Sequence, residues 1–210
     1  MAFFAGALVT IFIVVDPIAI SPLFLALTPT MKQNEKLRVM RRAVLVAAGI
    51  LIAFAAVGRL LLNGLGITIQ AFYIAGGILL LLISIDMLFA RPSRTRETPE
   101  EGEAARQSAD ISVFPLAIPI LAGPGAIATI VLYMSLAGTN VFKIAAVLLA
   151  LAISLAAAYL SMRLSTLVVR VLGETGINVV GRVAGILLAA LAVQFVLNGV
   201  ASYFHHVLAM

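Results

Sequence analysis

The sequence predicts an all-α polytopic membrane protein in which six transmembrane helices form two inverted three-helix repeats, with the first and fourth helices broken near the membrane midplane. Three observations predict this fold. The composition is 63% hydrophobic and 11% charged, with a mean hydropathy of +1.17, which excludes a soluble domain with a charged surface. Six apolar segments are long enough to cross a bilayer, and the two halves share a spaced pair of prolines.

The six apolar segments match the length of about 20 helical residues that crosses a hydrocarbon core of about 30 Å. We expect helices and not a closed barrel, because stretches such as "GGILLLLIS" do not alternate in polarity. The first segment has no Lys or Arg before it, so we expect a retained span and not a cleaved signal peptide. The predicted spans are 2–29, 41–62, 71–90, 111–136, 143–162 and 179–204.

Basic residues gather in alternate connections between these spans. Of the 14 Lys and Arg residues, only Arg59 and Lys143 lie elsewhere. This is the positive-inside pattern, so we expect both termini on the outer side of the membrane and no nucleic-acid partner. The chain has no Cys, which excludes disulfides. The other basic residues are Lys32, Lys36, Arg38, Arg41, Arg42, Arg91, Arg94, Arg96, Arg106, Arg163, Arg170 and Arg182.

A polar linker divides the chain into two similar halves. We expect a first three-helix repeat over 1–90, a cytoplasmic linker over 91–110 and a second, inverted repeat over 111–210. The linker has the Pro, Glu, Ser and Gly content of a solvated segment.

Ordered landmarks recur in the two halves. "DPIAISPLF" carries Pro17 and Pro22, and "IPILAGPGA" carries Pro119 and Pro124 at the same spacing, displaced by 102 residues. The motif "GILL" at 77–80 recurs displaced by 108 residues. Because each half holds three spans, the second half must cross the membrane in the opposite sense, which is a plan common among secondary transporters. Chance similarity between apolar segments with prolines is the alternative.

The prolines predict a break in the first span. Pro17 and Pro22 lack the N–H that a helix uses, and the residues before them, Asp16 and Ser21, are pushed toward extended geometry. A continuous helix over 2–29 would be about 40 Å long, which exceeds the hydrocarbon core. We expect Ser21 to be the N-cap of the helix after the break and Pro22 its first residue.

The fourth span is expected to break in the same way, with Gly123 as N-cap and Pro124 as the first helical residue. In an inverted repeat, the two half-helices would then present their N-termini to each other near the midplane. Each N-terminus carries unpaired amide donors and roughly half a positive charge, which attract a carboxylate. Gly123 and Gly125 lack side chains, so we expect a ligand to approach the backbone there.

Asp16 is expected deep in the membrane, about 20 Å along the first span. A carboxylate at that depth is costly and by default marks a functional site. The alternative, that Asp16 only caps the helix begun by Pro17, is compatible with such a role. Carboxylate, freed carbonyls and helix N-termini together suit a small zwitterion. The counterpart of Asp16 in the second half is Ile118, so we expect ion coupling to depend on the acid.

Three further polar residues are candidates for ion coupling or gating. Asp86 corresponds to Gln194 at the 108-residue displacement, and either could line a path or rest near the cytoplasmic interface. Arg59 could gate the outer end or simply extend its charged head to the interface.

Four stretches carry a resemblance to a known family: "VDPIAISPLFLALT", "FYIAGGILLLLISIDML", "FPLAIPILAGPGAIATI" and "GINVVGRVAGILLAALAVQFVLNGV". Together they resemble the MarC family of bacterial inner-membrane proteins. Its SnatA-like members are associated with transport of small neutral amino acids such as glycine and alanine, coupled to an ion gradient, so the resemblance implies that activity in a bacterial inner membrane. The family motifs fall on Asp16, Pro17, Ser21, Pro22, Pro115, Pro119, Gly123, Pro124 and Gly125.

This chain departs from the family at Ala19 and Ile20, where many relatives carry Gly and Asn. The change makes the first break drier and bears on substrate identity more than on fold.

We therefore expect a secondary transporter that uses no cofactor and no metal. Its expected partners are a small zwitterionic solute, a proton or sodium ion and membrane lipid, and a homo-oligomer is left open. The alternatives are export of another small solute, a membrane interaction protein without flux, and an intramembrane aspartyl hydrolase that uses Asp16 and Asp86. A hydrolase needs two carboxylates that share a proton at close range. We expect no enzyme, because Asp16 is predicted deep in the membrane and Asp86 near its inner end.

Overall fold

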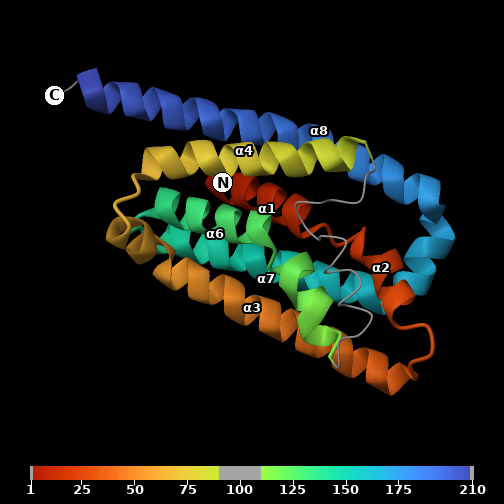
Figure 1. Ribbon diagram of the computed structural model, residues 1–210. Helices are drawn as coiled ribbons and strands as arrows, with labels where there is room; N and C mark the ends of the chain where they lie inside the picture. Colours follow the sequence, from red (N-terminus) through yellow and green to blue (C-terminus); the bar gives the residue numbers. More distant parts are fainter. Residues whose placement is uncertain (1, 90–109, 209–210) are drawn as a thin grey trace.

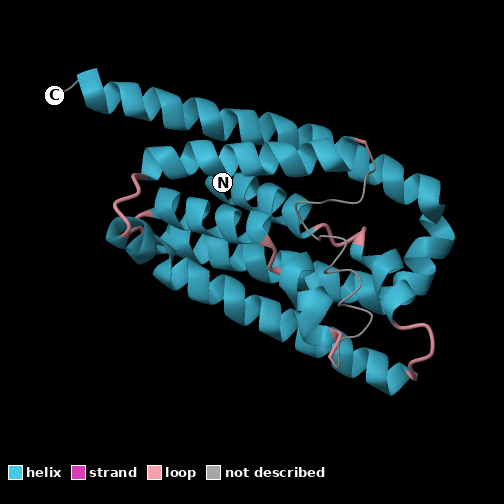
Figure 2. Cartoon of the chain, in the orientation of Figure 1, coloured by secondary structure: helices cyan, strands magenta, loops and turns pink. Residues whose placement is uncertain are grey.

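The computed structural model describes residues 2–89 and 110–208, and every regular element within these ranges is a helix (Figure 2). The predicted linker, 91–110, lies outside the described residues except for Asp110. The elements are α1 (Ala2–Val15), α2 (Ile20–Leu27), α3 (Gln33–Gly64), α4 (Ile69–Leu88), η1 (Ser112–Leu121), α6 (Pro124–Ala137), α7 (Val141–Arg163) and α8 (Ser165–Leu208).

Within the described residues, five helical segments are long and apolar enough to cross a membrane, with α1 and α2 together counted as one. There are six if η1 and α6, which meet at a bend of 54°, are taken as a single span. The multi-pass helical architecture is thus confirmed. The count of six and the inverted relation of the halves stay predictions.

Two predicted boundaries are wrong. The second span begins at Gln33 and not at 41, and the sixth lies in a helix that begins at Ser165 and not at 179. An apolar segment predicts only the part of a helix that lies in lipid. The helix itself can continue into the polar residues on either side, because its backbone hydrogen bonds do not depend on apolar side chains. At the start of α3, the Lys32 N–H donates to the Glu35 carboxylate at 2.9 Å and caps the polar extension.

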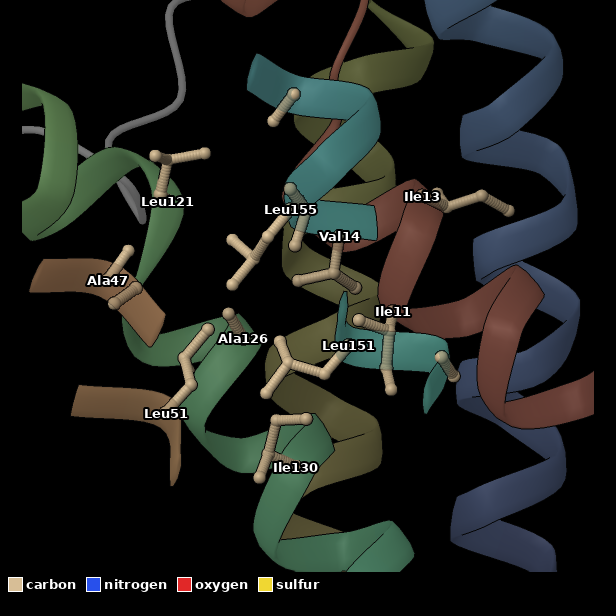
Figure 3. Close-up of a cluster of buried hydrophobic side chains, with 14 of the residues drawn as sticks. Ile11, Ile13, Val14, Ala47, Leu51, Leu121, Ala126, Ile130, Leu151 and Leu155 are labelled. Atoms are coloured by element: carbon tan, nitrogen blue, oxygen red, sulfur yellow. The ribbon is translucent and has the colours of Figure 1, made fainter. Parts of the chain in front are cut away.

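The helices pack in pairs (Figure 1). In this arrangement α4 runs along α8, α1 lies against α7, and both η1 and α6 lie against α3. A buried aliphatic core joins α1, α3, α6 and α7 (Figure 3), to which Ile11, Leu51, Ile130 and Leu151 contribute side chains. The first and fourth spans therefore contribute to the core of the bundle, while Ile118 and Pro124 at the fourth-span break are exposed.

Glycines let α4 and α8 approach each other closely. A Cβ atom on Gly77 would lie 2.8 Å from the Ala192 carbonyl oxygen, and one on Gly185 would lie 3.1 Å from the Ser84 carbonyl oxygen. Neither position accepts a side chain without a shift of the neighbouring backbone. Further toward its start, α8 is interrupted at Gly173, whose φ of 62° is readily adopted only by glycine.

Candidate functional site

The first span breaks at Asp16. Its backbone N–H still donates to the Phe12 carbonyl at 3.0 Å, but its φ of +50° is uncommon for a residue with a side chain. The turn that follows leads into α2 at Ile20, whose N–H donates to the Asp16 carbonyl at 3.4 Å. The predicted break is confirmed, but the extended geometry expected at Asp16 and Ser21 is not found, because Asp16 is left-handed and Ser21 lies within α2. The cause of the break is local, since Pro17 disfavours right-handed helical geometry at the residue before it.

Asp16 also acts as a local cap. Its carboxylate accepts a hydrogen bond from the Ala19 N–H at 3.3 Å, and the side chain is half-buried. The carboxylate therefore stabilises the turn between α1 and α2, but it does not cap a helix begun by Pro17, because α2 begins at Ile20 with Ala19 as its N-cap. A second role for the same group remains compatible with this one.

The prediction that Ser21 caps α2 is wrong. The helix begins two residues earlier than predicted, at Ile20, so Pro22 is its third residue and not its first. The Ser21 hydroxyl is fully buried, lies 2.7 Å from the Ser161 hydroxyl, and donates to the Ser161 carbonyl at 3.1 Å. A buried hydroxyl needs a partner, and α7 provides one across the bundle, while the Asp16 carboxylate holds the turn before α2.

The fourth span breaks between η1 and α6. Gly123 has extended geometry, with φ −69° and ψ 171°, and Pro124 is the first residue of α6, so this prediction is confirmed. Ile118, which precedes Pro119, also has extended backbone angles. A side chain at Gly123 would collide with the Pro119 carbonyl oxygen, which gives a packing reason for glycine at the N-cap.

The end of α1 meets the break of the fourth span at a small recess. The recess brings together four of the predicted site residues, Pro119, Gly123, Pro124 and Gly125, with Val14 of α1 and Ile83 of α4. Ile120 and Ala126 complete its lining, which does not include Asp16, Pro17, Ser21 or Pro22. The end of α1 thus reaches the N-terminus of α6, and the other four predicted site residues do not line the recess.

The face of Gly125 is covered, contrary to the expectation that a ligand approaches its backbone freely. A Cβ atom there would overlap Ile83 Cδ1 and lie 3.3 Å from Val14 Cγ1. The missing side chain is therefore replaced by two aliphatic groups from other helices. In this structure, the first turn of α6 is closed by protein atoms.

The chain is similar to known proteins over nearly its whole length. Residues 1–204 match the model of the family described as MarC family integral membrane protein. The chain belongs to the MarC family. This confirms the resemblance found in the four sequence stretches, and the match includes both proline motifs.

Three relatives illustrate the breadth of the MarC family. A UPF0056 membrane protein of Methanocaldococcus jannaschii is 38% identical over 95% of this chain and 97% of its own. The UPF0056 membrane protein YvbG of Bacillus subtilis is 34% identical over 97% and 96% of the two chains. The UPF0056 membrane protein YhcE of Escherichia coli is 32% identical over 96% and 92%. No solved structure matches the chain.

The other candidates for coupling or gating lie apart from the recess of this MarC protein. Asp86 is half-buried in the last turn of α4, and Arg59 is exposed near the end of α3. Gln194 is exposed on α8, where its amide Nε2 donates to Asn198 Oδ1 at 2.8 Å. None of the three lines the recess. Their proposed roles stay predictions.

Sequence reasoning missed Val14 and Ile83. Val14 lies two residues before Asp16 and could have been suspected from its place beside the break. Ile83 ends the apolar run "GILLLLI", in which the sequence does not distinguish it from the other aliphatic residues. Only the packing of α4 against α6 identifies it.

Proposed function

We propose that this protein is a secondary transporter of small neutral amino acids of the glycine or alanine type, coupled to an ion gradient and working by alternating access around a midplane site. One observation carries the proposal. The last turn of α1, just before the break of the first span, meets the break of the fourth span at one recess, where Val14 lies against Gly125 in the first turn of α6. Broken helices that meet inside a bundle are the usual location of a transporter's site.

The first turn of α6 offers the donors for a carboxylate. Pro124 has no N–H, and the first hydrogen bond within the helix runs from the Ile127 N–H to the Gly123 carbonyl at 3.0 Å. Helix geometry therefore leaves the amides of Gly125 and Ala126 without an acceptor in α6. Two adjacent N–H groups at a helix N-terminus match the two oxygens of one carboxylate.

Asp16 is the proposed partner for the solute's ammonium group and for the coupling ion. It is the only acidic residue in the proline motif of the first break, and it lies two residues after Val14, which lines the recess. A carboxylate opposite a helix N-terminus gives the site one negative and one positive pole, which suits a zwitterion better than an ion of one sign. Pro17, Ser21 and Pro22 would shape this side of the site, while Pro119 and Gly123 shape the other.

The α4–α8 contact supports the inverted repeat on which alternating access would depend. Gly77 faces the Ala192 carbonyl and the Val196 amide, and Gly185 faces the Ser84 carbonyl and the Leu88 amide. The displacement of 108 residues that relates the two glycines also relates Ser84 to Ala192 and Leu88 to Val196. The contact of the α4 glycine with the α8 backbone is therefore repeated, with the two helices exchanged, by the α8 glycine and the α4 backbone.

The packing of the other spans also relates each half of the chain to the other. The first span lies on α7, the second helix of the other half, and the fourth span lies on α3, the second helix of the first half. In the view of Figure 1, α2 and α6 begin near the middle of the bundle and lead toward opposite ends. This arrangement supports half-helices that open toward opposite sides of the membrane.

Charge supports an orientation with both termini outside a bacterial inner membrane. The start of α3, with Lys36, Arg38, Arg41 and Arg42, lies at the same end of the bundle as the α7–α8 junction (Figure 1). Arg163 and Arg170 lie at that junction. An excess of basic residues at one end is the mark of the cytoplasmic side.

Purified protein in proteoliposomes tests the proposal. We expect saturable exchange of labelled alanine or glycine, and we expect Asp16→Asn to abolish ion-driven uptake while counterflow persists. Asp110→Asn is the matched control, because Asp110 lies at the start of η1 in contact with the exposed Arg42. The absence of exchange for every small amino acid would overturn the substrate class. Coupled uptake that survives in Asp16→Asn would overturn the role of Asp16.

The same vesicles separate the alternatives. A transporter of another small solute would exchange that solute and not alanine, and an interaction protein would exchange none. The hydrolase requires Asp16 and Asp86 to act as a pair. The hydrolase predicts that Asp86→Asn and Asp16→Asn reduce activity equally. The transporter proposal predicts that Asp16→Asn has the larger effect on ion-coupled uptake.

A further inference from the structure

Two aliphatic side chains cover the first turn of α6 where it faces the recess. Val14 comes from α1 and Ile83 from α4, and both are buried, with exposed fractions of 4% and 1%. Their methyl groups fill the position that a side chain on residue 125 would occupy. The volume beside the Gly125 amide is therefore bounded by these two residues.

The same volume would receive the side chain of a bound amino acid. If the solute's carboxylate lies at the amides of Gly125 and Ala126, its α-carbon and side chain extend into the recess that Val14 and Ile83 bound. The recess has a volume of only about 10 Å³, so a bound solute must displace these residues, and a hydrogen or a methyl group demands the smallest displacement. A branched or longer side chain would have to move two groups that already contact Gly125.

We infer that Val14 and Ile83 set the upper limit on the size of the solute's side chain. This inference rests on the proposed function, because it requires an amino acid to bind at the recess. Both residues belong to the first half of the chain, yet they cover the broken helix of the second half. Their truncation would enlarge the site without removing any N–H donor that holds the carboxylate.

Transport selectivity tests the inference. We would measure uptake of labelled alanine in proteoliposomes and its competition by glycine, serine, valine and leucine, for the wild type, Val14→Ala and Ile83→Ala. A methylene group in an apolar pocket changes selectivity by about 10- to 200-fold. We therefore expect both variants to raise the preference for valine or leucine relative to alanine by about tenfold or more.

Leu80→Ala is the matched control. Leu80 is fully buried on the same helix, about one turn from Ile83, but it does not line the recess. Its truncation should lower stability and leave the order of competing amino acids unchanged. A change of selectivity in Leu80→Ala equal to that in Ile83→Ala would overturn the inference, since the effect would then reflect loosened packing.

A stability measurement tests the contact without transport. Gly125→Ala should lower the melting temperature in detergent, because its methyl group collides with Ile83 Cδ1. Gly125→Ala combined with Ile83→Ala should lose less than the sum of the two single losses. If the loss of melting temperature in the double variant equalled the sum of the two single losses, the contact between residues 125 and 83 would be contradicted, and the inference with it.

The outcomes separate the two proposals. Wild-type exchange of alanine together with unchanged selectivity in Val14→Ala and Ile83→Ala would overturn the size limit and leave the transporter intact. A wild type that exchanges no small amino acid would overturn both. Broadened selectivity in the two variants, with Leu80→Ala unchanged, supports the size limit.

Discussion

The hydroxyl oxygens of Thr10 in α1 and Tyr133 in α6 lie 2.9 Å apart and join the two broken spans by a buried hydrogen bond. Thr10 donates its own proton to the Gly6 carbonyl at 2.8 Å, so Tyr133 is the donor to Thr10. The Tyr133 ring also packs edge-on against Phe3 and Phe195, with ring centroids 5.8 and 5.7 Å away. This one side chain therefore links α1, α6 and α8.

Tyr133→Phe should lower stability, because it removes the donor to Thr10 and keeps the ring. Hydrogen bonds between helices in membranes contribute about 0.6 kcal/mol on average, so we expect a small but measurable loss in the free energy of unfolding in detergent. Tyr203→Phe is the control, since Tyr203 is 54% exposed. Equal stability of the two variants would show that the Thr10 bond contributes nothing.

The Ser21–Ser161 pair should show energetic coupling. Each serine is changed to alanine alone and together, and the free energy of unfolding is measured for all four proteins. We expect a coupling of about 0.6 kcal/mol between the two sites. Ser154→Ala should show no coupling with Ser21→Ala, because the buried Ser154 hydroxyl donates within α7 to the Ala150 carbonyl. Coupling of Ser21 to Ser154 as large as to Ser161 would refute the bond.

Neighbouring glycines should respond in opposite ways to alanine. Gly77→Ala and Gly185→Ala place a methyl group against the backbone of the facing helix and should each cost about 1–3 kcal/mol of unfolding free energy. At Gly76 and Gly181, no heavy atom lies within 4 Å of the position that an added methyl group would take. Alanine there should be neutral or stabilising, because it favours the helix. Thermal unfolding of the four variants decides the matter.

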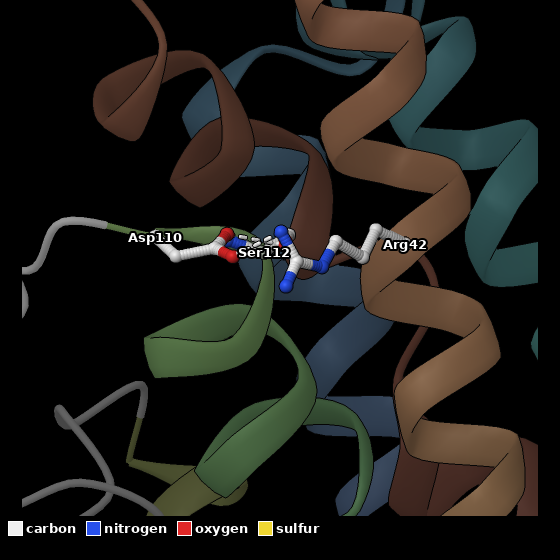
Figure 4. Close-up of polar contacts among 3 residues, drawn as sticks. All are labelled: Arg42, Asp110 and Ser112. Atoms are coloured by element: carbon white, nitrogen blue, oxygen red, sulfur yellow. Dashed lines mark hydrogen bonds and ion pairs between the residues drawn. The ribbon is translucent and has the colours of Figure 1, made fainter.

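The start of η1 should show a pH-dependent stability. Asp110 accepts hydrogen bonds from the Ser112 hydroxyl and, at 3.1 Å, from the Ser112 N–H, and it pairs with Arg42 of α3 (Figure 4). The Ser112 hydroxyl is the main cause that holds the pKa of Asp110 below its usual value of 3.8, and Arg42 adds to it.

A lowered pKa means that the charged carboxylate stabilises the folded state above the unfolded pKa, and that this contribution is lost as the pH falls through the folded pKa. The stability difference between wild type and Asp110→Asn should thus be full at pH 7 and shrink below about pH 4. Ser112→Ala should behave like a weaker Asp110→Asn. Arg41→Ala, at an exposed neighbouring position, is the control. A difference that does not change with pH would contradict this account.

Much of the candidate site follows from the sequence because proline acts locally. Asp16 and Ile118 precede Pro17 and Pro119, and both have lost helical backbone angles, as expected from steric contact with the proline ring. Gly123 and Pro124 form the predicted helix start for the same reason. The Ser21 prediction failed because a serine before a proline fits an N-cap locally, whereas its buried hydroxyl bonds to Ser161, 140 positions away.

By itself, the sequence determined the membrane class, the family and the proline-containing regions in which the first and fourth spans break, because hydropathy and the missing proline N–H are properties of the residues themselves. Only the tertiary structure decided which glycines must be glycine, which hydroxyls pair across helices, and that Val14 and Ile83 cover Gly125. The physical reason is that aliphatic residues in an apolar run are locally equivalent. Their roles depend on which helix lies opposite, and the packing of the whole bundle fixes that.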